Sequence, residues 1–290
     1  MFERLDACPS CGHLKFENHL VCTDHSVSGE SFALVKCAKC ELIFTNPRPA
    51  SAKLSSYYQS EDYISHTNKA NSLVNWIYKL VRFITLRKKF GLINQRSTGK
   101  TLLDFGCGTG HFLHHCEKNG WKVTGLEPDP KARNLSQTNL KGTVYSETKD
   151  VRGSFDMITA WHVIEHVSDL NETIKQLSKR LNPKGVLIIA LPNCNSFDAA
   201  YYREDWAGYD VPRHLYHFTH KSFKALATKH KLKLVSTLPM KYDAYYVSLL
   251  SEKYMTGKSS FVNAFRLGKK SNRRAKEKTE YSSLIYVLTK

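Results

Sequence analysis

Long apolar runs are missing from this 290-residue sequence: no uninterrupted stretch approaches the ~20 residues that a membrane-spanning helix requires. The opening residues, MFERLDACPSC, also lack the charged and then apolar order of a secretory signal peptide. We therefore expect a cytoplasmic protein without a transmembrane segment, whose eight cysteines serve as thiols or metal ligands before disulfides. A hydrophobic content of 41% excludes a disordered chain.

Acidic residues are also scarce, with 26 Asp and Glu against 43 Lys and Arg, a formal net charge of +17. The imbalance is local. Residues 101–200 carry eleven side chains of each sign, whereas residues 61–100 carry eight basic and two acidic, and residues 201–290 eighteen and seven. The two basic segments could face phosphates, anionic lipid or an acidic substrate, and a solvated surface is an equal alternative.

Four cysteines form two C-x-x-C pairs, CPSC at 8–11 and CAKC at 37–40. Two such pairs can place four thiolates around one Zn²⁺, and a site without an open position is structural. The sequence predicts a zinc ribbon over residues 1–48 that ends at the NPRP turn, 46–49. Cys22, His13, His19 and His25 lie between the pairs and could replace one ligand, but we leave Cys22 out. The predicted ligands are Cys8, Cys11, Cys37 and Cys40.

Residues 49–98 follow as a helical linker or cofactor cover. Within them, 71–90 has apolar residues at helical spacing on a basic background. Such a helix could lie on a membrane surface, but packing on the domain that follows is the favoured interpretation.

From Lys100 onward, buried strand patterns alternate with helical ones. Strands are expected at 100–105, 121–127, 153–167 and 185–193, with helices at 111–120 and 169–181. This alternation predicts a doubly wound parallel sheet, whose ligands bind beyond the carboxyl ends of the strands.

The first of these strands leads into DFGCGTG, and its spacing decides the type of nucleotide. A dinucleotide fold requires G-x-G-x-x-G, but Gly106, Gly108 and Gly110 stand at alternate positions. Asp104 would face a pyrophosphate unfavourably and suits a ligand with ammonium and sulfonium charges. Glu127, at the end of the next strand, can accept hydrogen bonds from ribose hydroxyls.

On these motifs, LLDFGCGTG, GLEPD and FDMITAWHVIEHV, the segment from about Lys100 to Met240 resembles class I S-adenosylmethionine-dependent methyltransferases. The resemblance implies a Rossmann-like α/β fold with a seven-stranded sheet. It also implies that Asp104, the three glycines and His162 border the methionine part of the cofactor and that Glu127 holds the ribose. For the adenine ring, Glu147 and Asp150 are both open.

The zinc-binding leader and the segment VPRHLYHF, 211–218, resemble a subgroup that includes sugar C-methyltransferases. That likeness implies a cover over the cofactor from Tyr58, Tyr63 and His66, for which packing between domains is an equal alternative. The larger sugar C-methyltransferases carry an additional domain that this sequence is too short to contain, so the resemblance does not carry over their substrate.

Methyl transfer to a hydroxyl or an acidic C–H group needs a base, and histidine has a suitable pKa. His166 lies at the carboxyl end of the fourth expected strand and His214 lies in the segment where relatives build their substrate wall, so both are candidate catalytic bases. Arg213 could grip a carboxylate or phosphate of the substrate. Packing and capping roles are the alternative for all three.

The C-terminal part predicts a helix at 221–231 capped by Thr219, a strand at 232–240 and, from the resemblance, an antiparallel seventh strand at 282–290. The methyltransferase domain would then cover 99–290 with a basic insertion at about 241–281, helical at its start and flexible over 266–280.

These features predict an enzyme that methylates the oxygen or carbon of a small-molecule or glycan-related acceptor. The alternatives are an RNA methyltransferase that uses the basic segments and a non-catalytic binding scaffold. The missing N-P-P-Y motif, in whose place stands LPNCNS at 191–196, counts against base methylation.

Overall fold

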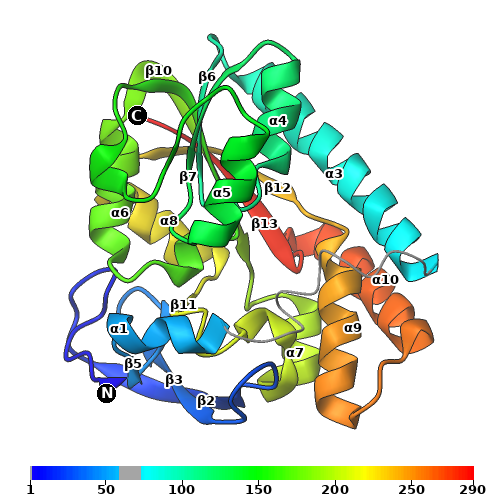
Figure 1. Cartoon of the computed structure of the whole chain (residues 1–290). Helices are drawn as coiled ribbons and strands as arrows, with labels where there is room; N and C mark the ends of the chain where they lie inside the picture. Colours follow the sequence, from blue (N-terminus) through cyan, green and yellow to red (C-terminus); the bar gives the residue numbers. More distant parts are fainter. Residues whose placement is uncertain (1, 59–72) are drawn as a thin grey trace.

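The computed structural model describes residues 2–58 and 73–290, and within the long helix α3 it describes side chains from residue 83 onward (Figure 1). Tyr63 and His66, and the helical stripe of 73–81, lie outside the described side chains. The helix predicted over 71–90 is α3, Leu73–Arg96.

The predicted seven-stranded sheet is confirmed. Its order is β12-β13-β10-β9-β6-β7-β8. The strand β13 lies antiparallel between β10 and β12, as expected for the last strand, and the pairs from β10 to β8 are parallel. The strands are β6 (Thr101–Phe105), β7 (Lys122–Leu126), β8 (Val144–Tyr145), β9 (Phe155–Trp161), β10 (Leu181–Pro192), β12 (Lys233–Pro239) and β13 (Ser283–Thr289).

Alternate residues of the central strands enter two separate cores. Leu102 and Met157 face a core that includes Ile93 of α3 and Leu113 of α4. Their neighbours face the other core, which α6 and α8 cover. The helices of this unit are α4 (His111–Lys118), α5 (Pro130–Thr138), α6 (Leu170–Lys179) and α8 (His220–Lys229), with short 3-10 turns η3 (Thr148–Asp150) and η4 (Ile164–His166).

The N-terminal part forms two small sheets. The strands predicted around the second cysteine pair are β3 (Ser31–Cys37) and β4 (Ile43–Thr45). They continue a four-stranded sheet of order β11-β4-β3-β2, where β2 is Phe16–Thr23. The edge strand β11, Tyr216–His217, is distant in the sequence from its partner β4, with which it pairs antiparallel. The remaining elements here are β1 (Phe2–Glu3), β5 (Arg48–Pro49), α1 (Ser51–Leu54) and η1 (Ser55–Tyr58).

The predicted insertion is two helices, α9 (Asp243–Thr256) and α10 (Phe261–Lys278). The expectation that 266–280 is flexible was wrong, because α10 buries a stripe that includes Leu267 and Ala275. Ser260 caps this helix at Asn263 N, and the predicted Thr219 cap of α8 is present as a reciprocal capping box with Ser222. The short elements before β11 are α7 (Phe197–Tyr202), η5 (Arg203–Asp205) and η6 (Ala207–Tyr209).

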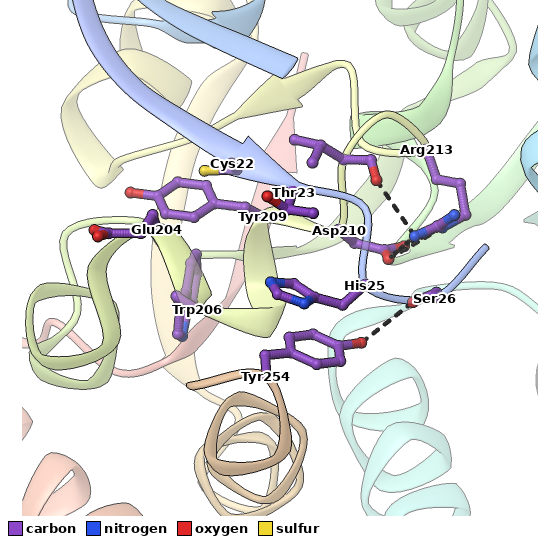
Figure 2. A pocket seen from close by; sticks show the side chains of 11 residues that line it. Cys22, Thr23, His25, Ser26, Glu204, Trp206, Tyr209, Asp210, Arg213 and Tyr254 are labelled. Carbon is purple, nitrogen blue, oxygen red and sulfur yellow. Dashed lines mark hydrogen bonds and ion pairs between the residues drawn. The ribbon is translucent and has the colours of Figure 1, made fainter. Parts of the chain in front are cut away.

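A buried ion-pair cluster joins the N-terminal sheet to the rest of the chain. Arg213 Nη2 lies 2.8 Å from Asp24 Oδ1 and 2.7 Å from Asp210 Oδ1. Both Arg213 and Asp24 are about 1% exposed. Burial alone would raise the pKa of Asp24, but the hydrogen bonds from Arg213 and Ser28 lower it. The turn after β2 is thereby fixed to the loop before β11. Figure 2 shows Arg213 beside its other partner, Asp210.

In the described part of the chain, no helix combines the length and the apolar character needed to cross a membrane.

Replacing Asp24 by asparagine should destabilise the protein strongly. The change leaves the guanidinium of Arg213 buried with Asp210 as its only acidic partner among the described residues. Removal of one partner from a buried ion pair typically lowers the free energy of unfolding by about 3–5 kcal/mol. Chemical denaturation with two-state analysis would measure the loss.

Asp205→Asn is the matched control. Its carboxylate pairs with His25 at 3.3 Å on the same contact between segments, but it is 28% exposed. A surface pair of this kind contributes at most about 1 kcal/mol. Equal losses in the two variants would contradict the importance of the buried cluster.

Candidate functional site

The glycine turn after β6 forms a left-handed backbone at the carboxyl edge of the sheet. Gly106, Gly108 and Gly110 have φ values of +76°, +55° and +78°, which side chains disfavour. A Cβ at Gly106 would lie 2.5 Å from Val163, and one at Gly110 would lie 2.3 Å from the Ser136 hydroxyl. Nothing lies within 4 Å of the corresponding position at Gly108. The first and third glycines are therefore required by packing, whereas the second faces open space.

Glu127 lies against this turn. It directly follows β7, and its Oε2 accepts a hydrogen bond of 2.8 Å from the backbone N–H of Gly108. Its Oε1 accepts a second from the N–H of Asp129, at 2.9 Å. The structure therefore brings together the glycine turn and the acid at the next strand end, as the sequence predicted.

Asp104 lies beneath the turn and is 3% exposed. Its Oδ1 accepts a hydrogen bond of 2.6 Å from the hydroxyl of Thr159. Burial raises the pKa of Asp104 to about 7, against the opposing effects of Thr159 and of the Lys89 ammonium. Lys89 comes from α3 and its Nζ lies 4.4 Å from the centre of the Trp161 ring. Burial in turn lowers the pKa of Lys89.

His162 follows β9 with a left-handed φ of +56°. Its Nδ1 lies 3.4 Å from Glu165 Oε1 and its Nε2 lies 3.1 Å from Asp243 Oδ2, at the start of α9. Burial acts to lower its pKa, but the two carboxylates outweigh burial and raise the pKa of His162 to about 9. The ring lies between two acids at the edge where the glycine turn lies.

The structure brings the two candidate bases together. The rings of His166 and His214 are 4.5 Å apart and nearly perpendicular. Nδ1 of His166 is 3.0 Å from the Arg213 carbonyl and 3.0 Å from the hydroxyl of Tyr58. Nδ1 of His214 is 2.9 Å from the Gly208 carbonyl. Burial and the neighbouring His214 lower the pKa of His166 to about 4. Whether either ring is a base stays a prediction.

Arg213, the predicted substrate ligand, is surrounded by its own chain. Besides the two aspartates, its guanidinium donates to the carbonyl oxygens of Tyr57 and Val211. Figure 2 shows this region, where His25 stacks on Tyr254 with ring centres 4.5 Å apart. The space among these side chains is about 10 Å³, room for one water at most. These contacts do not support a role in substrate binding.

The four predicted zinc ligands form one cluster near the N-terminus. Their sulfur atoms lie within 4.8 Å of one another. Sγ of Cys8 and Cys40 are 3.5 Å apart, and Sγ of Cys11 and Cys37 are 3.6 Å apart. A tetrahedron with ~2.3 Å Zn–S bonds has edges of about 3.8 Å. The cluster therefore fits a single zinc ion, and Cys22 lies outside it.

A cavity of about 250 Å³ opens between α3 and the start of α9. Its lining combines apolar surface from Leu92, Met240 and Ile285 with three lysines. Lys88 donates to the hydroxyl of Tyr242 at 3.3 Å. The lysines are Lys88, Lys89 and Lys241.

Sequence reasoning missed Lys89, Glu165 and Asp243. Lys89 is one of several basic residues in a helical pattern, and Asp243 is far from His162 in the sequence. Only Glu165 carried a signal, because it directly precedes His166 and lies three residues after His162.

The cysteine cluster predicts a measurable sulfur-bound metal. Replacing Cys37 by serine should weaken the thiolate-to-cobalt charge-transfer absorption of the cobalt(II)-substituted protein and lower its affinity for zinc, because one of four thiolate ligands is lost. Cys22→Ser is the control, since Cys22 is buried between the pairs but outside the cluster. An equal loss in both variants, or absorption and zinc affinity in Cys37→Ser that match those of wild type, would contradict the site.

The raised pKa of Asp104 predicts a pH-dependent cost in stability. An unfolded aspartate ionises near pH 4, whereas the folded one holds its proton to about pH 7. Between these values only the native state binds the proton, so the free energy of unfolding falls as pH rises. Asp104→Asn should therefore be up to about 4 kcal/mol more stable than wild type at pH 8. At pH 4 the two should unfold alike, and an equal difference at both pH values would refute this account.

Comparison with known proteins shows which family the chain belongs to. Residues 78–237 match the family described as "Methyltransferase domain", which is more than half of the sequence. A ubiquinone biosynthesis O-methyltransferase of Rhodopseudomonas palustris (strain TIE-1) is 31% identical over 107 residues, 33% of this chain and 42% of the relative. The ubiquinone biosynthesis O-methyltransferase of Caulobacter vibrioides is 30% identical over 105 residues, 33% of this chain and 42% of the relative. The match thus spans less than half the length of these relatives.

Solved structures share the fold at low sequence identity. The magnesium protoporphyrin IX methyltransferase of Synechocystis PCC 6803, solved with bound SAH, has a TM-score of 0.54 at 12% identity. The match covers 82% of this chain and 99% of that one. The plantazolicin methyltransferase, also in complex with SAH, has a TM-score of 0.51 at 16% identity, covering 82% and 93%. With its glycine turn, adjoining acids and seven-stranded sheet, the chain belongs to the methyltransferase domain family and carries a class I S-adenosylmethionine-dependent methyltransferase domain.

Proposed function

We propose that this protein transfers the methyl group of S-adenosylmethionine to an oxygen or carbon atom of a small-molecule or glycan-related acceptor. The observation that carries the proposal is the open backbone at Gly108, held against Glu127 at the carboxyl edge of β6 and β7. In parallel sheets this edge is where ligands bind.

The residues at this edge fit the cofactor. The space that a Cβ at Gly108 would fill allows close approach of a ligand to the backbone. Asp104 and Glu127 suit an ammonium and a pair of ribose hydroxyls, and His162, which follows β9 at the same edge of the sheet, remains a proposed neighbour of the methionine part. When bound, S-adenosylmethionine supplies an electrophilic methyl group on sulfur, and the chain contributes orientation and exclusion of water.

The cavity between α3 and α9 is the proposed acceptor site. Apolar side chains and three lysines line it, which supports an acceptor with an apolar body and an acidic group. The names of the O-methyltransferases among the relatives favour oxygen over carbon as the methylated atom. An acceptor hydroxyl would lose its proton on attack, and His166 and His214 remain the proposed acceptors of that proton.

Calorimetric titration with S-adenosylhomocysteine tests the cofactor. Micromolar binding is expected, with none for NAD⁺. Gly108→Ala should weaken binding by roughly tenfold or more, since its methyl group enters the cradle, and Glu127→Ala should weaken it through lost ribose contacts.

Gly153→Ala is the matched control, because Gly153 also has a positive φ, +85°, and nothing within 4 Å of its Cβ position. Both alanine variants carry a similar backbone penalty, about 1 kcal/mol, but only Gly108→Ala should lose affinity. Binding that is unaffected by Gly108→Ala would refute the cofactor site. Cofactor binding without transfer to any acceptor would favour the scaffold, and copurified RNA that dissociates steeply with salt would favour the RNA methyltransferase.

A further inference from the structure

A second group of metal-ligand side chains lies outside the cysteine cluster. Glu165, His166 and His214 each offer one ligand atom, and the three atoms lie within 4.8 Å of one another. Glu165 and His166 come from η4 after β9, and His214 comes from the loop before β11. The group therefore joins two segments at the carboxyl edge of the sheet.

Hydrogen bonds fix which nitrogen of each histidine is free. Nδ1 of His166 lies 3.0 Å from both the carbonyl oxygen of Arg213 and the hydroxyl of Tyr58, and Nδ1 of His214 lies 2.9 Å from the carbonyl oxygen of Gly208. A carbonyl oxygen only accepts, so each Nδ1 carries the hydrogen and each Nε2 keeps its lone pair. Metal-binding histidines are oriented in this way, with the second ring nitrogen donating to a carbonyl or carboxylate.

The carboxylate of Glu165 is fully buried and has one ion-pair partner among the described residues. Its exposure is 0%, and neither oxygen accepts a hydrogen bond from any described residue. That partner is His162, whose Nδ1 is 3.4 Å from Oε1, longer than a normal hydrogen bond. Buried carboxylates are normally hydrogen-bonded, paired or bound to a metal, because desolvation is costly otherwise.

The nearby aspartate does not use the free nitrogen of His214. Oδ2 of Asp210 lies 3.9 Å from Nε2, beyond hydrogen-bond distance, and both oxygens of that carboxylate already accept from Arg213. One ring nitrogen of each histidine and one oxygen of Glu165 thus lie within 4.8 Å of one another, an arrangement that a cation between them would stabilise.

We propose that Glu165, His166 and His214 form a second metal site, for a divalent transition-metal ion bound through one Glu165 oxygen and Nε2 of each histidine. Two histidines and one carboxylate are a ligand set of zinc and of non-haem iron, and three protein ligands leave coordination positions open. His166 is only half-buried, so solvent reaches this side of the proposed site.

This inference goes beyond the proposed function and alters one part of it. With a metal bound, the two rings are ligands and cannot accept the proton of the acceptor. An open coordination position would instead bind the hydroxyl oxygen of the acceptor and lower the pKa of that hydroxyl group, as bound metals do for water.

Cobalt(II) titration of the full chain tests the site, with the cysteine cluster first filled by one equivalent of zinc. The expected result is weak visible d–d absorption that saturates at one further equivalent, without thiolate-to-cobalt charge transfer. Glu165→Gln and His214→Gln keep the side-chain size and should weaken cobalt binding by roughly tenfold or more. His114→Ala, which removes a histidine on α4, should bind cobalt like wild type.

Two results would overturn the proposal: absence of the second equivalent in wild type, as expected if a proton alone occupies the space, or an unchanged titration in Glu165→Gln. The wild-type titration decides even if a variant fails to fold. Because the readout is metal absorption, it is independent of cofactor binding and methyl transfer, so failure of the proposed function would leave it intact.

Discussion

The buried guanidinium of Arg213 is the interaction on which the arrangement of the site depends. Its partner Asp24 lies 189 residues away in the sequence, and its partner Asp210 lies three residues away. Its Nη1 donates a hydrogen bond to the carbonyl oxygen of Tyr57. One side chain thereby fixes three segments relative to one another: the N-terminal sheet, the turn η1 that contains Tyr57, and the loop that follows η6. A buried charge has no favourable alternative to these partners, so the three segments hold one relative position.

The same loop serves the carboxyl edge of the sheet. Because Arg213 is fixed, its carbonyl oxygen orients His166, the next residue His214 reaches the same place, and Leu215 donates its N–H to the carbonyl of Glu165. The residue predicted to bind substrate thus acts, in these contacts, on the placement of the two histidines predicted beside it.

Local sequence patterns predicted the fold, whereas the contacts between distant segments could not be predicted from the sequence. Strand and helix alternation, the glycine spacing and the C-x-x-C pairs are short motifs that each report a local structure, and the structure has all of them in the predicted order. The ion pair of His162 with Asp243 and the position of Lys89 beside Asp104 join distant segments, so periodicity cannot indicate them. The basic segment of α10 was expected to be flexible because its charges hide a small-residue stripe, including Ala264, Gly268 and Ser271.

The edge strand β11 has a consequence for the order in which the chain can fold during synthesis. Phe44 pairs with Tyr216, so the N-terminal sheet cannot acquire its fourth strand until more than 170 further residues have left the ribosome. The first translated segment must wait with an unpaired edge on β4, and a metal held by its cysteines would keep that segment compact in the interval. Early metal loading would then protect the nascent chain from pairing with a neighbour.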